Sequence, residues 1–355
     1  MPIFSSRRKL PFGLDVGSSS VKAIQLRPSP AGYELGAFGL VSLPPDAIVD
    51  GVIQSPPTVI SAIREVVRKS GVQGKDAVVS LAGHSVITKK LRLPAMKEEE
   101  LAESITWEAE QHVPFAIDEV YLDFQILGEA SGDPTAMDVI LVAVKKTKVD
   151  DYLAVIRDAG LNPVVVDVDT FALENQYELN HPTEQPEVVA LIDVGAAFLK
   201  TNVLHRGVSI FARDVAFGGN QYTQAIAQRT RLPFPEAEAL KRGEDVPGVS
   251  WDDIVPALEA VSRDLSLEIQ RTFDYFASTS GADRVDRIVL SGGCARLKGI
   301  DTFLSSSWRV PVELADPFKN LVVDPARFPM ETLDEVGPAG AVVVGLGLRR
   351  PGDKP

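Results

Sequence analysis

Cysteine is almost missing from this chain, because Cys294 is the only one among its 355 residues. A lone cysteine excludes a disulfide framework and indicates a reducing compartment, so we expect a cytoplasmic protein. Basic residues are also scarce: 36 lysines and arginines stand against 49 acidic residues, and the net charge of -13 argues against nucleic-acid binding. No run approaches the roughly 20 apolar residues that span a bilayer, and the N-terminus lacks the apolar segment of a secretion signal. We therefore expect a soluble protein with no direct membrane span.

A short phrase occurs twice in the sequence, as GLDVGSSSVKAIQL from Gly13 and LIDVGAAFLKTNVL from Leu191. Its two aspartates, Asp15 and Asp193, lie 178 positions apart (193 minus 15). Each copy reads as an apolar strand, an aspartate, a glycine turn and a second strand, which predicts two related half-domains that face one cleft. The length suits two domains, and we expect a first lobe over residues 10–170 and a second over 171–350.

The first copy has the composition of a phosphate-binding turn. Its turn and second strand offer backbone amides, hydroxyl groups and one ammonium group, and a carboxylate at the strand end can hold Mg²⁺ through water. The residues are Asp15, Gly17, Ser18, Ser19, Ser20 and Lys22, with Asp193, Gly195 and Ala196 as their second-copy counterparts. We expect Asp15 and Asp193 to share the metal. An ordinary hairpin with a Gly-Ser turn is the alternative.

The first half contains a block that the second half lacks. Alternating and helical patterns predict strands over 77–82 and 86–93, a helix over 97–112, and strands over 121–127 and 139–144. We expect this β-β-α-β-β block, residues 75–149, to be an insertion that serves as a docking module or as a structural lid.

Three further features of the second half point to a nucleotide. Gly218 and Gly219 precede a predicted helix over 220–229, whose free amides suit a phosphate, although a plain turn is the alternative. Glu238 and Lys241 lie on one helical face and could grip ribose and adenine, or form a surface ion pair. A buried strand over 287–290 leads into a third turn with Gly292, Gly293 and Arg296, where the backbone can approach a flat ring.

These three loops, in this order, resemble those of the actin-like ATPase superfamily. DVGSSSVK is similar to its first phosphate loop, DVGA at residues 193–196 to its second, and SGGCARLKG to its adenosine loop. Within that superfamily the chain resembles the PilM family of type IV pilus assembly proteins, from about Lys9 to Arg350. The resemblance rests on residues 107–115, 121–124, 159–164 and 167–173, and on Arg213-Asp214 ahead of the glycine pair.

The resemblance implies an α/β protein with the actin-like, duplicated ribonuclease H-like, two-lobe fold and an inserted β-β-α-β-β subdomain in the first lobe. It implies ATP and Mg²⁺ between the lobes, and a groove for the N-terminal cytoplasmic peptide of the membrane protein PilN. It further implies a platform for pilus biogenesis and twitching motility, in the cytoplasm and peripheral to the inner membrane, in contact with other inner-membrane and motor components.

One departure from the family concerns hydrolysis. Relatives commonly place Ser or Thr after the second DVGA, whereas this chain has Ala197, Phe198 and Leu199, which cannot donate hydroxyl hydrogen bonds to a γ-phosphate. Asp169 is the candidate to orient the attacking water, with a helix N-cap as its alternative role. We expect nucleotide binding with slow hydrolysis at most. The alternative functions are an FtsA-like cell-division protein, a small-molecule kinase, and a scaffold with a vestigial pocket.

Overall fold

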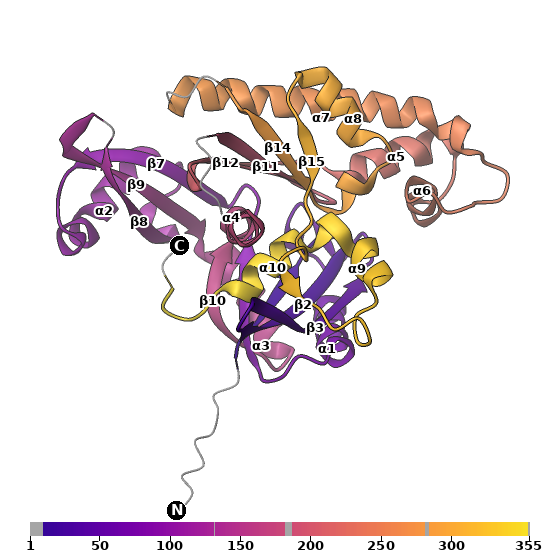
Figure 1. Ribbon diagram of the computed structural model, residues 1–355, viewed down its shortest axis with the longest axis horizontal. Coiled ribbons are helices and arrows are strands. Elements are labelled where there is room, and N and C mark those ends of the chain that lie inside the picture. Colours follow the sequence, from indigo (N-terminus) through magenta and orange to yellow (C-terminus); the bar gives the residue numbers. More distant parts are fainter. Residues whose placement is uncertain (1–9, 131, 182–186, 281–283, 354–355) are drawn as a thin grey trace, which may run out of the picture.

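Two large β-sheets carry the fold, and a third, smaller sheet projects to one side (Figure 1). The computed structural model describes residues 10–130, 132–181, 187–280 and 284–353. Among these residues, no helix has both the length and the apolar character needed to cross a bilayer.

The first sheet has six strands in the order β10-β6-β1-β2-β3-β16. The duplicated phrase supplies the β1-β2 hairpin, which continues antiparallel into β3, while β6 pairs with β1 and β10 with β6 in parallel. Helices α1 and α3 pack on one face of this sheet, and α4 and α10 on the other. The bounds are β1 Phe12–Val16, β2 Ser20–Ser29, β3 Gly32–Ser42, α1 Pro56–Ser70, β6 Asp76–Leu81, α3 Lys146–Asp158, β10 Asn162–Val168, α4 Asp169–Asn180, β16 Leu321–Val322 and α10 Ala341–Leu348. Two short strands, β4 Ile48–Val49 and β5 Val52–Ile53, pair with each other in a sheet of their own.

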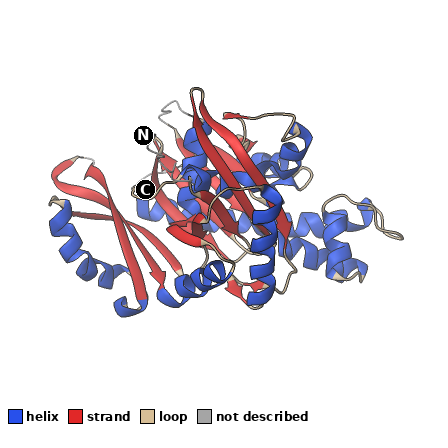
Figure 2. Cartoon of the chain, turned by 90° about the horizontal axis from the view of Figure 1, so that it is seen from below, coloured by secondary structure: helices blue, strands red, loops and turns tan. Residues whose placement is uncertain are grey.

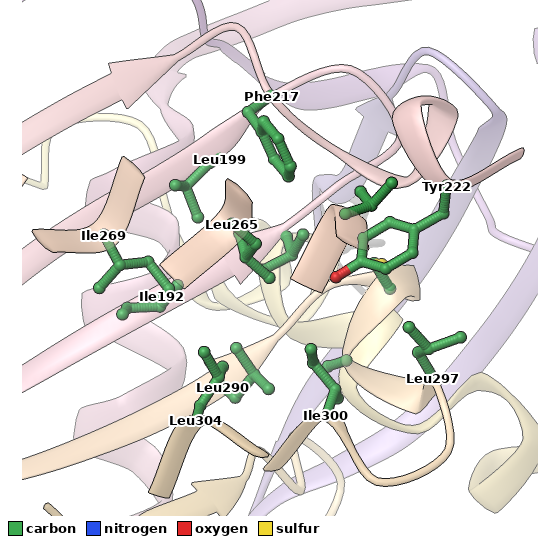
Figure 3. Close-up of a cluster of buried hydrophobic side chains, with 14 of the residues drawn as sticks. Ile192, Leu199, Phe217, Tyr222, Leu265, Ile269, Leu290, Leu297, Ile300 and Leu304 are labelled. Carbon is green, nitrogen blue, oxygen red and sulfur yellow. The ribbon is translucent and has the colours of Figure 1, made fainter. Parts of the chain in front are cut away.

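The second sheet repeats the first in the order β13-β12-β11-β14-β15. Helices α5, α7 and α8 cover it, and Figure 3 shows the side chains of strands and helices that meet in its core. The bounds are β11 Val188–Val194, β12 Leu199–His205, β13 Val208–Val215, α5 Gly219–Thr230, α6 Phe234–Lys241, α7 Trp251–Ser280, β14 Arg287–Ser291, α8 Ile300–Trp308 and β15 Val312–Leu314.

The insertion forms a sheet of its own. Strands β7 (Val86–Pro94), β8 (Val120–Ala130) and β9 (Asp133–Lys145) pair in the order β7-β9-β8, and α2 (Glu98–His112) packs on one face through an apolar cluster. Figure 2 shows this unit beside the body of the molecule. The predicted range 75–149 was too long at its start, because β6 belongs to the first sheet. The insertion in the sheet topology is therefore β-α-β-β.

The C-terminal part of the chain returns to the first lobe. Strand β16 extends the edge of the first sheet beside β3, and α10 packs between that sheet and α4. The crossing of the two helices is close, since a Cβ on Gly345 would lie 1.8 Å from the carbonyl oxygen of Ala172. The topology departs here from the expected division, in which all of 171–350 formed the second lobe. Helix α9 (Met330–Val336) lies between β16 and α10 in sequence.

Candidate nucleotide site between the lobes

Both copies of the duplicated phrase place a lysine directly across from the aspartate. In the first hairpin Asp15 is the register partner of Lys22, and the ammonium Nζ lies 2.8 Å from Asp15 Oδ2. In the second, Lys200 faces Asp193 with Nζ 2.9 Å from Oδ1. All four side chains are largely buried. The duplication therefore extends from the backbone to a buried ion pair in each lobe.

Asp169 joins the second pair. It is the first residue of α4, where its Oδ2 lies 2.8 Å from Lys200 Nζ and its Oδ1 accepts a 2.5 Å hydrogen bond from Ser80 Oγ. The N-cap of α4 is Val168, with no side-chain cap bond, so the alternative role of Asp169 as an N-cap is not observed. Burial acts to raise the pKa of Asp169, but Lys200 outweighs it and holds the pKa below the ordinary value.

These charges act across the lobes. Burial disfavours the ammonium of Lys200, yet Asp169, Asp193 and Asp15 together raise its pKa well above the ordinary value. Lys22 in turn contributes to the lowered pKa of Asp169. The site is thus a cluster of three carboxylates and two ammonium groups drawn from both lobes and the α4 start.

The cluster does not have the character of a preformed magnesium site. Each of the two aspartates predicted to share the metal already binds a lysine. Among the described residues there is no group of three or more His, Cys, Asp or Glu side chains able to hold a metal ion. Mg²⁺ at Asp15 and Asp193 stays a prediction, and the ion pairs weigh against it because a cation would have to displace an ammonium group.

The glycine turns use part of their amide donors internally. Gly17 N donates to Ser20 O at 3.1 Å, and Gly195 N donates to Phe198 O at 2.9 Å, the same bond in both copies. The first amides of α5 are also engaged, since Gly219 N and Asn220 N donate to the carbonyls of Gly195 and Ala196, each at 2.8 Å. The expectation of free amides at the start of this helix was wrong, because the second phosphate loop folds over it.

Three of the predicted glycines differ in what surrounds them. A Cβ on Gly218 would lie 2.6 Å from the Gly195 oxygen, and a Cβ on Gly292, whose φ is 89°, would lie 2.4 Å from the Val194 oxygen. Both are glycine because backbones cross there. Gly293, by contrast, has nothing within 4 Å of its Cβ position, and both Gly293 and Arg296 are exposed. The third turn therefore offers an open face at Gly293 where a flat ring could lie.

Glu238 and Lys241, which were predicted to bind ribose and adenine, form an ion pair in α6. Lys241 Nζ lies 2.7 Å from Glu238 Oε2 and donates to Thr223 Oγ1 and Gly219 O at 3.0 and 3.1 Å. These bonds tie α6 to the start of α5. The two residues are brought together beside Gly219, as their spacing predicted, and they form more than a surface pair.

Sequence reasoning did not anticipate several contacts between the lobes. The ring of Phe198, in the second phosphate loop, lies against two glycines of the first lobe: Cβ atoms on Gly83 and Gly51 would meet it at 2.8 and 3.1 Å. Asp214 Oδ2 accepts a 2.6 Å hydrogen bond from Gly83 N, and burial raises the pKa of Asp214 to about 6. These contacts close the lobes together at the side where the γ-phosphate loop was predicted.

A second missed group is Lys148, which donates to the carbonyl of Gly51 and lies over the Tyr152 ring. Burial lowers the pKa of Lys148 to about 8, against the opposing effect of Asp169. The spacing of seven residues from aspartate to lysine in both hairpins could have revealed the role of Lys200. The local sequence gave no reason to place Lys148 in the site, and it marked Asp214 only through the family resemblance. The contacts of both residues span many positions.

The comparisons with known proteins agree with this geometry. Residues 13–351 match the model of the family described as type IV pilus assembly protein PilM. A solved PilM-PilN type IV pilus biogenesis complex is similar at 29% identity and a TM-score of 0.86, over 96% of this chain and 98% of that chain.

More distant structures share the fold alone. The ethanolamine utilization protein EutJ from Carboxydothermus hydrogenoformans is similar at 14% identity and a TM-score of 0.58, over 95% of this chain and 89% of that one. MreB5 of Spiroplasma citri bound to ADP is similar at 12% identity and a TM-score of 0.53, over 95% of each chain. The predicted actin-like fold is confirmed. The chain belongs to the type IV pilus assembly protein PilM family.

Proposed function

We propose that this protein is a cytoplasmic platform that binds the N-terminal tail of PilN and holds ATP between its lobes. Through PilN it would lie at the inner membrane and contact other inner-membrane and motor components in pilus biogenesis and twitching motility. The binding of PilN is proposed from one observation, which is a groove between the edges of two sheets. The buried ion cluster described above supports the second.

The groove lies between the insertion and the first lobe. Its cavity has a volume of about 340 Å³, and consecutive residues of two strands line it, 121–125 of β8 and 166–168 of β10. Each strand is an edge of its sheet among the residues described. An extended peptide at such edges gains main-chain hydrogen bonds, and its alternate side chains can enter pockets.

The chemistry of the groove suits an apolar segment with one polar anchor. Apolar side chains such as Phe124, Val142 and Val166 form most of the wall. Asp167 and Arg349 lie in the lining as a buried ion pair, Nε to Oδ2, at 2.9 Å. The solved PilM-PilN complex is similar over nearly the whole chain, which supports PilN as the occupant.

A matched pair of variants tests this groove. Val166 in β10 and Val322 in β16 lie at opposite edges of the first sheet, and both are 42% exposed. Val166→Glu puts a charge into the groove and should weaken binding of a PilN tail peptide at least about tenfold, since burying an unpaired carboxylate is costly. Val322→Glu makes the same change outside the groove and should leave the affinity unchanged. Fluorescence anisotropy measures both affinities. If the two variants bind the PilN tail peptide equally tightly, the assignment of the groove is wrong.

For the nucleotide, the two ammonium groups of the cluster are the candidate phosphate ligands, and each would exchange a carboxylate oxygen for a phosphate oxygen. Lys22 and Lys200 supply the charge, and the open face at Gly293 with the Lys241 and Glu238 pair suits the nucleoside. We propose that ATP binds here mainly through these lysines, with Mg²⁺ contributing little. Titration of the protein with ATP, with and without EDTA, checks both points. An affinity that vanishes with EDTA would show that the metal carries the binding.

Slow turnover at most is part of the same proposal. A water-orienting carboxylate needs a free oxygen that faces the γ-phosphate. Both oxygens of Asp169 are engaged, one by Ser80 and one by Lys200. The loop expected to donate a hydroxyl group to the γ-phosphate has Ala197, Phe198 and Leu199 instead. Nucleotide would then serve to set the lobe geometry rather than to drive a cycle.

A further inference from the structure

The insertion sheet has two edges, and only one of them faces the groove proposed for PilN. The edge opposite β8 is β7, which runs beside β13, the edge strand of the second sheet. The cavity between them has a volume of about 830 Å³, larger than that of the β8 groove. The function proposed above makes no use of it.

Backbone edges form the walls of this cavity, which we call the β7 groove. Residues 86–92 of β7 and 209–214 of β13 line it without a break. Because alternate side chains of a strand point to opposite faces, an unbroken run of lining residues means that the edge itself faces the space. Within the described residues β7 pairs only with β9, and β13 only with β12. Val86 N already donates to Gly83 O, and Ser209 N to Glu174 Oε1. The remaining outer amides and carbonyls of these two edges are available to an added strand.

The charge of the β7 groove is opposite to that of the protein. Its lining holds four cations, Lys89, Lys90, Arg92 and Arg213, against two carboxylates, Asp138 and Asp214. Lys90 and Arg92 share Asp138, at 2.7 and 3.6 Å, and Arg213 lies over the ring of Tyr275. His84 and His112 complete the titratable groups. The groove is net positive on a chain whose formal net charge is -13.

We propose that the β7 groove is a second docking site, which takes an extended acidic segment of a partner protein. Two edges on either side favour a strand, and the surplus of cations favours glutamate and aspartate over lysine and arginine. Ile87, Ile210 and Phe211 give apolar contacts for the alternate side chains. Since PilN's proposed groove lies at the other edge of the insertion, the two segments bind at the same time.

The probe is a labelled peptide of about seven residues that alternates glutamate with valine, compared with one that has lysine in place of glutamate. In fluorescence anisotropy with the full chain, the acidic peptide should bind at least about tenfold tighter than the basic one. Lys89→Glu and Arg213→Glu, one on each wall, should each weaken it several-fold. The exposed Lys75 lies outside the groove, so Lys75→Glu is the matched control and should change nothing.

Hydrogen exchange locates the bound peptide. Slower exchange in β7 and β13 supports the proposal, whereas protection confined to β8 and β10 would place the peptide in the other groove and overturn it. Because Arg213 contacts Tyr275, circular dichroism should confirm that each variant folds, and Lys89→Glu alone remains decisive if Arg213→Glu does not fold. An unchanged affinity of Lys89→Glu for the acidic peptide would also overturn the proposal. So would self-association of the wild-type chain that Lys89→Glu abolishes, because the groove would then bind a second copy of the chain.

Discussion

The ammonium of Lys200 lies 2.8 Å from the carboxylate of Asp169 and so links the second hairpin to the first turn of α4. The same ammonium reaches Asp193 at 2.9 Å. One lysine therefore pairs with two buried carboxylates, at the place where the two lobes meet. Removing it would leave both charges without this partner.

We predict that Lys200→Met lowers the free energy of unfolding by about 3 kcal/mol at neutral pH, since breaking a buried pair strands its partner. The pKa of Asp169 is held below 3.8, so this contribution is present at neutral pH and fades only in acid below that value. Urea unfolding of the variant and the wild type measures this loss of stability. Lys69, in an exposed pair with Glu65, gives the control: Lys69→Met should cost less than about 0.5 kcal/mol. Equal losses in the two variants would contradict the role assigned to Lys200.

The local parts of the fold could be predicted from the sequence. Period-two alternation around a glycine turn defines the β1-β2 and β11-β12 hairpins, whose partners are adjacent in the chain. The partner of β6 could not be predicted, because its parallel pairing with β1 and β10 is a long-range choice that the strand pattern does not encode. The return of β16 to β3 is a pairing of the same kind.

In the candidate site too, local contacts could be predicted from the sequence and long-range contacts could not. Asp15 and Lys22 lie within one hairpin and could be placed together from the repeat. The contact of Phe198 with Gly51 and Gly83, and that of Asp214 with Gly83, join segments more than 100 positions apart. Such contacts follow from how the lobes close, which the sequence pattern alone does not report.

A second prediction concerns Lys22. Lys22→Met should weaken ATP binding about tenfold or more, because an ammonium group beside phosphates forms charge-assisted hydrogen bonds. Isothermal titration with wild type, Lys22→Met and Lys69→Met separates this effect from a change in net charge alone. If Lys22→Met binds ATP as tightly as Lys69→Met, Lys22 is not a phosphate ligand.

A third prediction tests the second phosphate loop. Phe198→Ser supplies the hydroxyl donor that this loop lacks, and Phe198→Leu removes the ring without one. We expect Phe198→Ser to bind ATP more tightly relative to ADP by about fivefold, the value of one hydrogen bond of about 1 kcal/mol. Phe198→Leu should keep the wild-type ratio. Both lose stability, by up to about 3 kcal/mol, since Phe198 is buried. The same ratio in both variants would refute a hydroxyl-specific effect.

Turnover offers a further check on Asp169. The wild type should hydrolyse ATP far more slowly than the usual enzyme median of about 10 per second. Both carboxylate oxygens of Asp169 are engaged, so neither is free to orient a water molecule. Ser80→Ala frees one oxygen while keeping Lys200 in place, and we expect its rate to rise above that of the wild type in a phosphate-release assay. A wild-type rate near the median would contradict this account.

The last prediction concerns Glu174 in α4, which accepts a hydrogen bond from Ser209 N at 3.1 Å and lies 3.5 Å from Asn202 Nδ2. Burial raises the pKa of Glu174 to about 7 from 4.5. The folded protein therefore keeps a proton that the unfolded chain releases, and the contribution of Glu174 to stability is lost as pH rises from 4.5 to about 7.

Glu174→Gln keeps the acceptor for Ser209 and removes the titration. Relative to wild type, its free energy of unfolding should increase by about 2 kcal/mol between about pH 5 and about pH 8, at about 1.4 kcal/mol for each tenfold shift in acid dissociation. Comparison with wild type at each pH cancels the other groups that titrate in this range, such as Asp214. The exposed Glu110, in α2, is the control, and Glu110→Gln should show no such trend. A flat difference between Glu174→Gln and wild type would mean that Glu174 is ionised in the folded protein at neutral pH, stabilised by its hydrogen bonds.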